Sequence, residues 1–149
     1  MIPTSKPKHP HRLARFVTKK TAALLCKIKS SDIYRIECWG NVVYVHGKGV
    51  SKFVSYADFP PILGVEQPSN ADFVYWRKRW RKIQAPGQKN QAPEFWSQFF
   101  AYQFHQAASV DELYAWGKLV NEVKSAFIEA TLEQLRQSYR HDRWELDNF

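Results

Sequence analysis

The group of side chains with the clearest chemical potential is a run of cations interrupted by two indole rings. It comprises Trp76, Arg77, Lys78, Arg79, Trp80, Arg81 and Lys82. Cations bind phosphate groups or acidic surfaces, whereas indoles stack on nucleic-acid bases or pack into a core. Because Trp76 and Trp80 are four residues apart, a helix would place both on one side. The run favours a rigid cationic face that contacts phosphates. The alternatives are a solvated helix face and a basic amphipathic helix on a membrane or in an acidic groove.

The net charge of +8 arises in the first part of the chain. Residues 1–60 contain eleven lysines and arginines against three acids, whereas residues 61–149 contain eleven of each. This asymmetry indicates one electropositive surface and an anionic partner. Nucleic acid fits that description, and an anionic membrane surface or an acidic protein would meet the same charge.

The sequence lacks the motifs that would mark a known class of enzyme. No histidine is spaced from Cys26 or Cys38 in the manner of a zinc site, and the nucleotide-binding, hydrolase and metalloprotease signatures are absent. His46 and His105, with Lys48, would cleave RNA by general acid–base catalysis only if the fold brought them together. We therefore expect no catalytic residue, cofactor or metal, and a small metal-independent nuclease is the least favoured hypothesis.

The first segments that must position these residues are an arm and a short amphipathic stretch. Residues 1–11 hold three prolines, two histidines and two lysines, so we expect a disordered basic arm. Leu13, Phe16 and Leu24 recur at helical spacing and predict a helix over residues 12–25. The alternation over residues 24–29 fits a strand equally well.

The clearest β signal predicts an antiparallel meander of three to four strands. Strands are expected at residues 33–39, 42–46 and 50–56, separated by glycine-containing turns. In the second turn Lys48 is flanked by glycines. A tight turn explains this pattern, and a phosphate-holding loop is the alternative.

Alternation assigns Tyr34 and Ile36 to one face of this meander, and Arg35, Trp39 and Tyr44 to the other. The second face is unusually aromatic for one that water covers. Two explanations stay open: a helix covers it, or it is a stacking platform for single strands.

Prolines and glycines between residues 58 and 68 separate a β-rich part, 24–57, from a helical part, 70–141. Asn70 is the expected N-cap of a helix over residues 71–84 that buries Phe73, Trp76, Trp80 and Ile83. Pro93 is the expected first residue of the next helix, whose aromatic residues occupy two sides and predict a central place in the core.

Ser109 with Glu112 forms a capping box for a last helix that would run to about Arg140. A helix of roughly thirty residues would be about 45 Å long, more than a compact domain of this size needs. It would then pack on a second copy or on a partner. A break near Thr131 is the alternative.

These observations predict one α+β domain over residues 12–149, with a small antiparallel meander packed against C-terminal helices and a long last helix. Two cysteines, no secretory signal and no apolar run long enough to span a membrane predict reduced thiols and a cytoplasmic, intracellular protein. Organellar import is the alternative, because residues 1–31 contain no acid.

The predicted function is non-enzymatic binding of DNA or RNA, largely through electrostatic contact with the backbone. The alternative is an adaptor or assembly subunit whose last helix binds a protein partner or a second copy. Trp39 and Tyr44 are the candidates for base stacking. The predicted nucleic-acid-binding residues are Arg12, Arg15, Lys19, Lys20, Arg35, Trp39, Tyr44, Lys48, Lys52, Arg77, Lys78, Arg79, Arg81 and Lys82.

Overall fold

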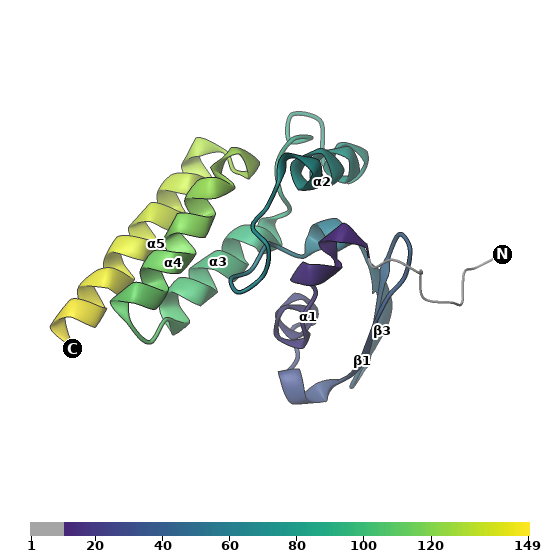
Figure 1. Ribbon diagram of the computed structural model, residues 1–149, viewed down its shortest axis with the longest axis horizontal. Coiled ribbons are helices and arrows are strands. Elements are labelled where there is room, and N and C mark those ends of the chain that lie inside the picture. Colours follow the sequence, from purple (N-terminus) through teal and green to yellow (C-terminus); the bar gives the residue numbers. More distant parts are fainter. Residues whose placement is uncertain (1–10) are drawn as a thin grey trace. The chain divides into compact units, whose positions relative to one another are not determined.

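The computed structural model describes residues 11–149, which divide into two compact units. The first unit ends at Pro60 and the second begins at Pro61. Figure 1 shows a small sheet with short helices in the first unit and helices alone in the second. The predicted basic arm lies outside the described residues, except for its last residue, His11. A single domain over residues 12–149 stays a prediction.

The first unit begins with two short helical segments where one longer helix was predicted. A 3-10 helix, η1, covers Arg12–Phe16, and α1 covers Lys19–Cys26. Thr18 separates them because its backbone is extended and its hydroxyl accepts a hydrogen bond from the backbone N–H three residues on, as an N-cap does. Lys27 is the C-cap of α1 and has a left-handed backbone, with a φ of 59°. Because residues 24–26 are helical and Lys27 is left-handed, the strand alternative for residues 24–29 is wrong.

A three-stranded antiparallel sheet follows, which confirms the α+β class. β1 covers Ile33–Cys38, β2 covers Val43–Gly47 and β3 covers Val50–Val54, in the order β1-β2-β3. The described residues contain no fourth strand. Two further 3-10 helices, η2 at Ser30–Asp32 and η3 at Tyr56–Asp58, precede and follow the sheet.

One face of the sheet belongs to the core of the first unit. Val43 and Val45 of β2 are fully buried, as are Ala22 of α1 and Phe16 of η1. α1 contacts β1 and lies on this side of the sheet (Figure 1). The alternating burial of β2 leaves the other face turned outward.

The second unit begins with α2 at Asn70–Ile83 and α3 at Glu94–Gln106. Both helices start within a residue of the predicted positions. Ser69 rather than Asn70 is the N-cap of α2, because its side chain and that of Asp72 form a capping box. Pro93 is the N-cap of α3 rather than its first residue.

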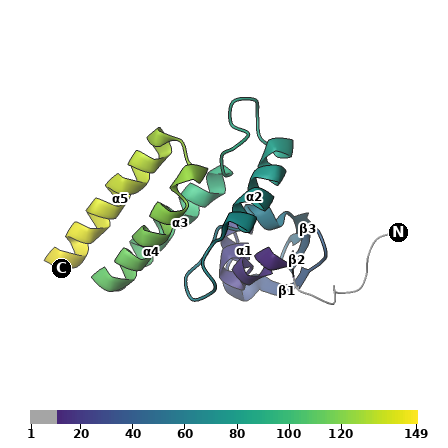
Figure 2. The same cartoon turned by 45° about the horizontal axis from the view of Figure 1, so that its top comes forward.

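The predicted long last helix is confirmed, but it does not begin at Ser109, because the chain turns back after Glu122. α4 covers Val110–Glu122, a 3-10 turn, η4, covers Lys124–Ala126, and α5 covers Glu129–Asn148. Ser109 caps α4 as predicted, but the Glu112 carboxylate accepts from the backbone N–H of Ala108 rather than from that of Ser109, so the predicted capping box is only half formed. α5 has 20 residues and packs against both α3 and α4 in a three-helix arrangement (Figure 2).

Aromatic rings form most of the core of the second unit. Trp76, Trp80, Trp96 and Phe100 are fully buried, and Phe104 is nearly so. α3 contributes three of these rings and contacts α4 and α5, which confirms its predicted central place.

Among residues 11–149, no helix combines the length and the apolar character that crossing a lipid bilayer requires.

Candidate nucleic-acid interface

A β-bulge near the start of β1 changes the face that Tyr34 occupies. Ile33 pairs with Gly47 and Arg35 pairs with His46, so the register shifts by one residue at Tyr34. An extra residue in one strand reverses the alternation of its side chains. Tyr34 therefore lies beside His46, with ring centroids 5.4 Å apart, and is 58% exposed. Its predicted place on the same face as Ile36, opposite Arg35 and Tyr44, is therefore wrong.

The outer face of the sheet carries a group of neighbouring rings that we term the aromatic face: Tyr34, Trp39, Tyr44, His46 and Phe53. Phe53 is the cross-strand partner of Tyr44, and its ring centroid lies 5.2 Å from that of Tyr44 and 5.1 Å from that of Trp39. His46 continues the group, 6.4 Å from Tyr44. Phe53 is 54% exposed. Of the two explanations left open, burial under a helix of the first unit does not fit this exposure.

Polar contacts hold the aromatic face in place. The Tyr44 hydroxyl shares a hydrogen bond of 2.7 Å with the hydroxyl of Ser51 on β3. The guanidinium of Arg35 lies 5.9 Å from the centroid of the Tyr44 ring. The buried Tyr56 donates its O–H to the backbone carbonyl of Trp39. These contacts order the rings before any partner arrives, which lowers the entropic cost of binding.

Two of the predicted cations adjoin the aromatic face. Arg35 is 61% exposed there, where its Nε lies 3.4 Å from a carboxylate oxygen of Glu37. Lys48 is exposed in the tight turn between β2 and β3. Four other predicted cations lie on the short helices that precede the sheet. Arg12 and Arg15 are on η1, and Lys19 and Lys20 are in the first turn of α1.

Lys52 lies on the opposite face of the sheet from the aromatic face. Its cross-strand partner is Val45, whose side chain is fully buried, and partners across a strand pair share a face. Lys52 also acts on Cys26 of α1: burial raises the pKa of the Cys26 thiol, and the Lys52 ammonium partly opposes that rise. Lys52 therefore does not belong with the predicted base-stacking residues.

The predicted cationic run is a face of α2 in the second unit, built on buried indoles. Trp76 and Trp80 stack with their centroids 6.3 Å apart, and both are fully buried. Arg77 is half-buried, with its guanidinium 5.3 Å from the centroid of the Phe73 ring. The other four cations, Lys78, Arg79, Arg81 and Lys82, are exposed. The predicted burial of Ile83 is wrong, since 43% of this residue is exposed.

His105, in the aromatic helix α3, is exposed rather than packed in the core. Its side chain is 69% exposed, and its Nδ1 lies 3.3 Å from a carboxylate oxygen of Asp142 on α5. His46 belongs to the aromatic face of the first unit. The two histidines of the nuclease hypothesis thus lie in different units, and that hypothesis stays a prediction.

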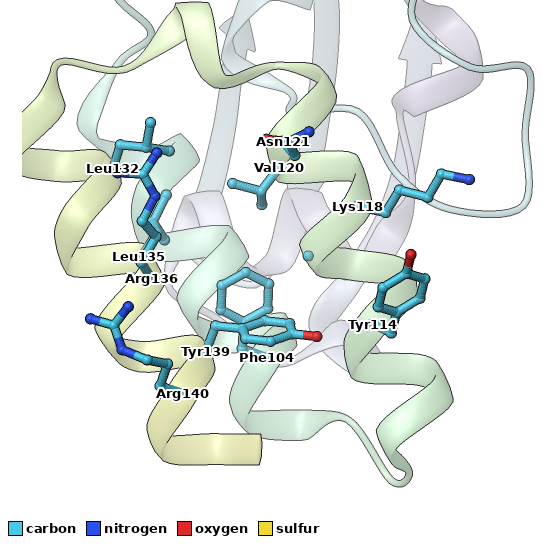
Figure 3. A pocket seen from close by; sticks show the side chains of 11 residues that line it. Phe104, Tyr114, Lys118, Val120, Asn121, Leu132, Leu135, Arg136, Tyr139 and Arg140 are labelled. Atoms are coloured by element: carbon cyan, nitrogen blue, oxygen red, sulfur yellow. The ribbon is translucent and has the colours of Figure 1, made fainter. Parts of the chain in front are cut away.

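A hollow of about 400 Å³ opens between α4 and α5 in the second unit. Figure 3 shows Phe104 and Val120 inside it, with Lys118 and Tyr114 on the α4 side and Arg136 on the α5 side. Nothing in the sequence pattern had singled out these residues as a group.

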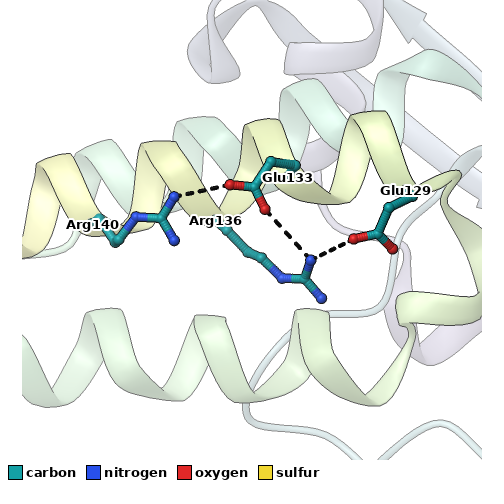
Figure 4. A network of polar contacts seen from close by, with 4 residues as sticks. All are labelled: Glu129, Glu133, Arg136 and Arg140. Carbon is teal, nitrogen blue, oxygen red and sulfur yellow. Dashed lines mark hydrogen bonds and ion pairs between the residues drawn. The ribbon is translucent and has the colours of Figure 1, made fainter.

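The arginines beside this hollow are matched by acids of their own helix. Arg136 Nη1 lies 2.8 Å from Glu129 and 3.6 Å from Glu133, and Arg140 Nη2 lies 3.0 Å from Glu133 (Figure 4). Hydrogen bonding by Arg140 lowers the pKa of the Glu133 carboxyl. The hollow therefore presents little net charge along α5, and we assign it no ligand.

Phe53 and His46 belong to the aromatic face but were not among the predicted binding residues. The sequence carried a signal for both, because His46 is two residues from Tyr44 in β2, and Phe53 follows Ser51 at strand spacing in β3. Tyr34 carried no such signal, since its position depends on the bulge.

No family model, curated protein or solved structure matches this chain. The fold and the site define it as an α+β protein whose three-stranded sheet exposes an aromatic face beside cations.

Proposed function

We propose that the protein binds single-stranded DNA or RNA without enzymatic chemistry, through the aromatic face of its sheet. Single strands offer unstacked bases, and exposed aromatic rings on a sheet stack on them. The observation that carries the proposal is the exposure of Tyr34 and Phe53, 58% and 54%, beside the ordered Tyr44 ring. Rings of this size are normally buried when packing is their only role.

Electrostatic attraction supplies the second part of the proposal. The first 60 residues hold the whole net charge of +8, and Arg35 and Lys48 adjoin the aromatic face. Phosphates would contact these cations while bases stack on the rings. The exposed cations of α2 provide further contacts with the backbone, independent of sequence.

Fluorescence anisotropy with a labelled oligonucleotide, as a single strand and as a duplex, tests the proposal. Binding should favour the single strand and weaken as salt rises, because bound cations release counterions. Tyr44→Ala and Phe53→Ala should each weaken binding by about 1–3 kcal/mol, the usual cost of losing one stacked base. Tyr114→Ala is the matched control, because Tyr114 is 60% exposed on α4.

Three results would contradict stacking on the sheet: binding that is unchanged in Phe53→Ala, an equal loss in Tyr114→Ala, or a preference for the duplex. Circular dichroism of each variant shows whether the fold is retained. A loss of binding that accompanies a loss of β structure would not support the proposal.

A second candidate, an adaptor that binds a partner or itself through α5, is favoured by one observation. Trp144 is 56% exposed near the end of α5, and its ring lies 5.8 Å from that of the exposed Phe149. If this pair mediates self-association, light scattering should show a dimer that Trp144→Ala disrupts. A monomer at high concentration would remove self-association from consideration.

We place this binding in the cytoplasm, with organellar import as the competing location. Neither Cys26 nor Cys38 forms a disulfide bond among residues 11–149, which fits a reducing compartment. A fluorescent fusion of the full chain tests this, and an organellar signal would contradict a cytoplasmic location.

A further inference from the structure

A group of metal-ligating side chains lies near the end of α5, and none of its members lines the hollow or belongs to the cationic face of α2. His141, Asp142 and Glu145 each direct a ligand atom to the same place, with all three atoms within 4.8 Å of one another. His105 of α3 reaches Asp142 from the neighbouring helix. The group thus joins two helices of the second unit.

The separations within this group are close to those around a bound metal ion. His141 Nε2 lies 3.1 Å from Glu145 Oε1, and the ligand atoms of His141, Asp142 and Glu145 all lie within 4.8 Å of one another. Ligand atoms that are about 2.0–2.1 Å from a tetrahedral zinc ion lie about 3.4 Å from each other. Because the side chains of His141 and Glu145 are 66% and 45% exposed, small rotations can bring the three ligand atoms onto one ion.

Asp142 makes this group different from the ordinary ion pairs on the surface of α5. Its side chain is only 10% exposed, yet among the described residues neither lysine nor arginine pairs with it. Within residues 11–149 its one hydrogen-bonding partner is the His105 imidazole, at 3.3 Å. A buried carboxylate is costly unless a cation compensates it. A divalent ion would supply the missing charge, and with two carboxylates and neutral imidazoles the complex would be uncharged.

The ends of two helices add to the negative potential at this place. His105 lies in the last turn of α3, which ends at Gln106, and Glu145 lies near the end of α5, which ends at Asn148. The C-terminal end of a helix carries a partial negative charge that favours cations. Both ends therefore support a positive ion beside Asp142.

We propose that His141, Asp142 and Glu145 form a zinc-binding site, in which His105 is a positioning residue that orients Asp142 from α3. Imidazole nitrogen with carboxylate oxygen is a ligand set that zinc accepts. A hydrogen bond from a neighbouring side chain to a ligating group is the usual way to fix its orientation. The bound ion would fasten α3 to α5. This proposal is independent of the nucleic-acid function.

Calorimetric titration of the full chain, free of any histidine tag, with zinc chloride tests the site. One equivalent of Zn²⁺ should bind, and Tm should rise with zinc concentration, because the ion binds only the folded state. Co²⁺ should give visible absorption bands that report coordination directly.

The variants separate ligands from neighbours. His141→Ala and Asp142→Asn should abolish the Co²⁺ bands, whereas His105→Ala should weaken zinc binding by about 10- to 100-fold without abolishing it. Glu133→Gln is the matched control for Glu145→Gln, because both carboxylates are 45% exposed on α5. Of these two glutamate variants, Glu145→Gln should weaken zinc binding and Glu133→Gln should not.

Two outcomes would overturn the proposal. One is the absence of any zinc-dependent heat, Tm shift or Co²⁺ band. The other is zinc binding that persists unchanged in His141→Ala, which would place the ion on other residues. Circular dichroism of Asp142→Asn, whose shape matches the original side chain, confirms that a loss of binding reflects a lost ligand rather than a lost fold.

Discussion

The Trp96 indole of α3 stands edge-on to the Trp80 indole of α2, with ring centroids 5.0 Å apart and an interplanar angle of 81°. The same ring makes a second edge contact with Trp76, at 4.9 Å. Edge-to-face pairs of this kind stabilise a fold by more than the burial of their surface area alone would. One indole of α3 thus holds both indoles of α2, and the cations between them are turned outward as a consequence.

Trp80→Ala should therefore destabilise the protein strongly. Removing a fully buried large aromatic side chain typically costs about 3–5 kcal/mol, from lost burial and from the cavity that remains. Urea unfolding followed by fluorescence measures the change. Arg79→Ala, one residue away and exposed, should stay within about 0.5 kcal/mol of the original protein. A small effect of Trp80→Ala would show that the indoles do not anchor α2.

The two faces of the sheet predict different effects of removing a cation on nucleic-acid binding. Arg35→Ala, on the aromatic face, should weaken binding and reduce the slope of log affinity against log salt by about 1, because one phosphate contact is lost. Lys52→Ala, on the opposite face, should leave that slope nearly unchanged. Equal slopes for the two variants would indicate that charge alone, and not this surface, attracts the ligand.

Cys26 should react slowly with alkylating reagents at neutral pH. Burial raises the pKa of its thiol, and only the thiolate reacts, so the reactive fraction should increase as the pH is raised toward that pKa. Lys52→Met should slow the reaction further, because the ammonium that opposes the rise is gone. The rate of alkylation against pH, measured in a Cys38→Ala background, gives the result. A faster reaction in Lys52→Met would contradict the position of Lys52 on the α1 side of the sheet.

Gly117→Ala should destabilise the second unit, although alanine is the better helix former by about 1 kcal/mol. A Cβ at Gly117 would lie 2.5 Å from Cε2 of Tyr139, so that ring must move. The Tyr139 ring is also in edge contact with Phe104, at 5.5 Å. Overpacking of this kind costs about 1–3 kcal/mol.

A double-mutant cycle with Tyr139→Leu tests the cause of this destabilisation. Gly117→Ala should be neutral or stabilising once the ring is removed, because only the gain in helix propensity is left. Thermal unfolding measures each of the four proteins. An unchanged penalty in the Leu background would show that the Tyr139 contact is not the source.

Local patterns were sufficient to predict the elements that depend on neighbours in sequence. The spacing of Trp76 and Trp80 predicted their burial, and Ser109 marked the start of α4 correctly. The alternation in β2 was equally reliable, because Val43 and Val45 are both buried on the core face and Tyr44 between them is not. Each of these cases needs only the period of a helix or a strand.

Three of the errors occurred where a local feature interrupts the period of a helix or a strand. The bulge at Tyr34 reversed the alternation, Thr18 divided the first helix, and the turn after Glu122 divided the last. None of these interruptions involves a proline, and glycine is absent from all three. The group formed by His105 and Asp142 was beyond prediction for another reason: 37 residues separate them, and only the packing of α5 on α3 brings them together.

The order of the strands has a consequence for the solution behaviour of the protein. In the part of the chain that the structure describes, β1 and β3 each pair only with β2, so both expose a row of unpaired backbone groups on which another chain could add a strand. Lys52 stands in the middle of β3, and a lysine there is a common protection against such aggregation. Variants in which Lys52 and other lysines are replaced by neutral residues, to abolish nucleic-acid binding, should therefore precipitate more readily. For this reason, charge reversal to glutamate is the better design for those experiments.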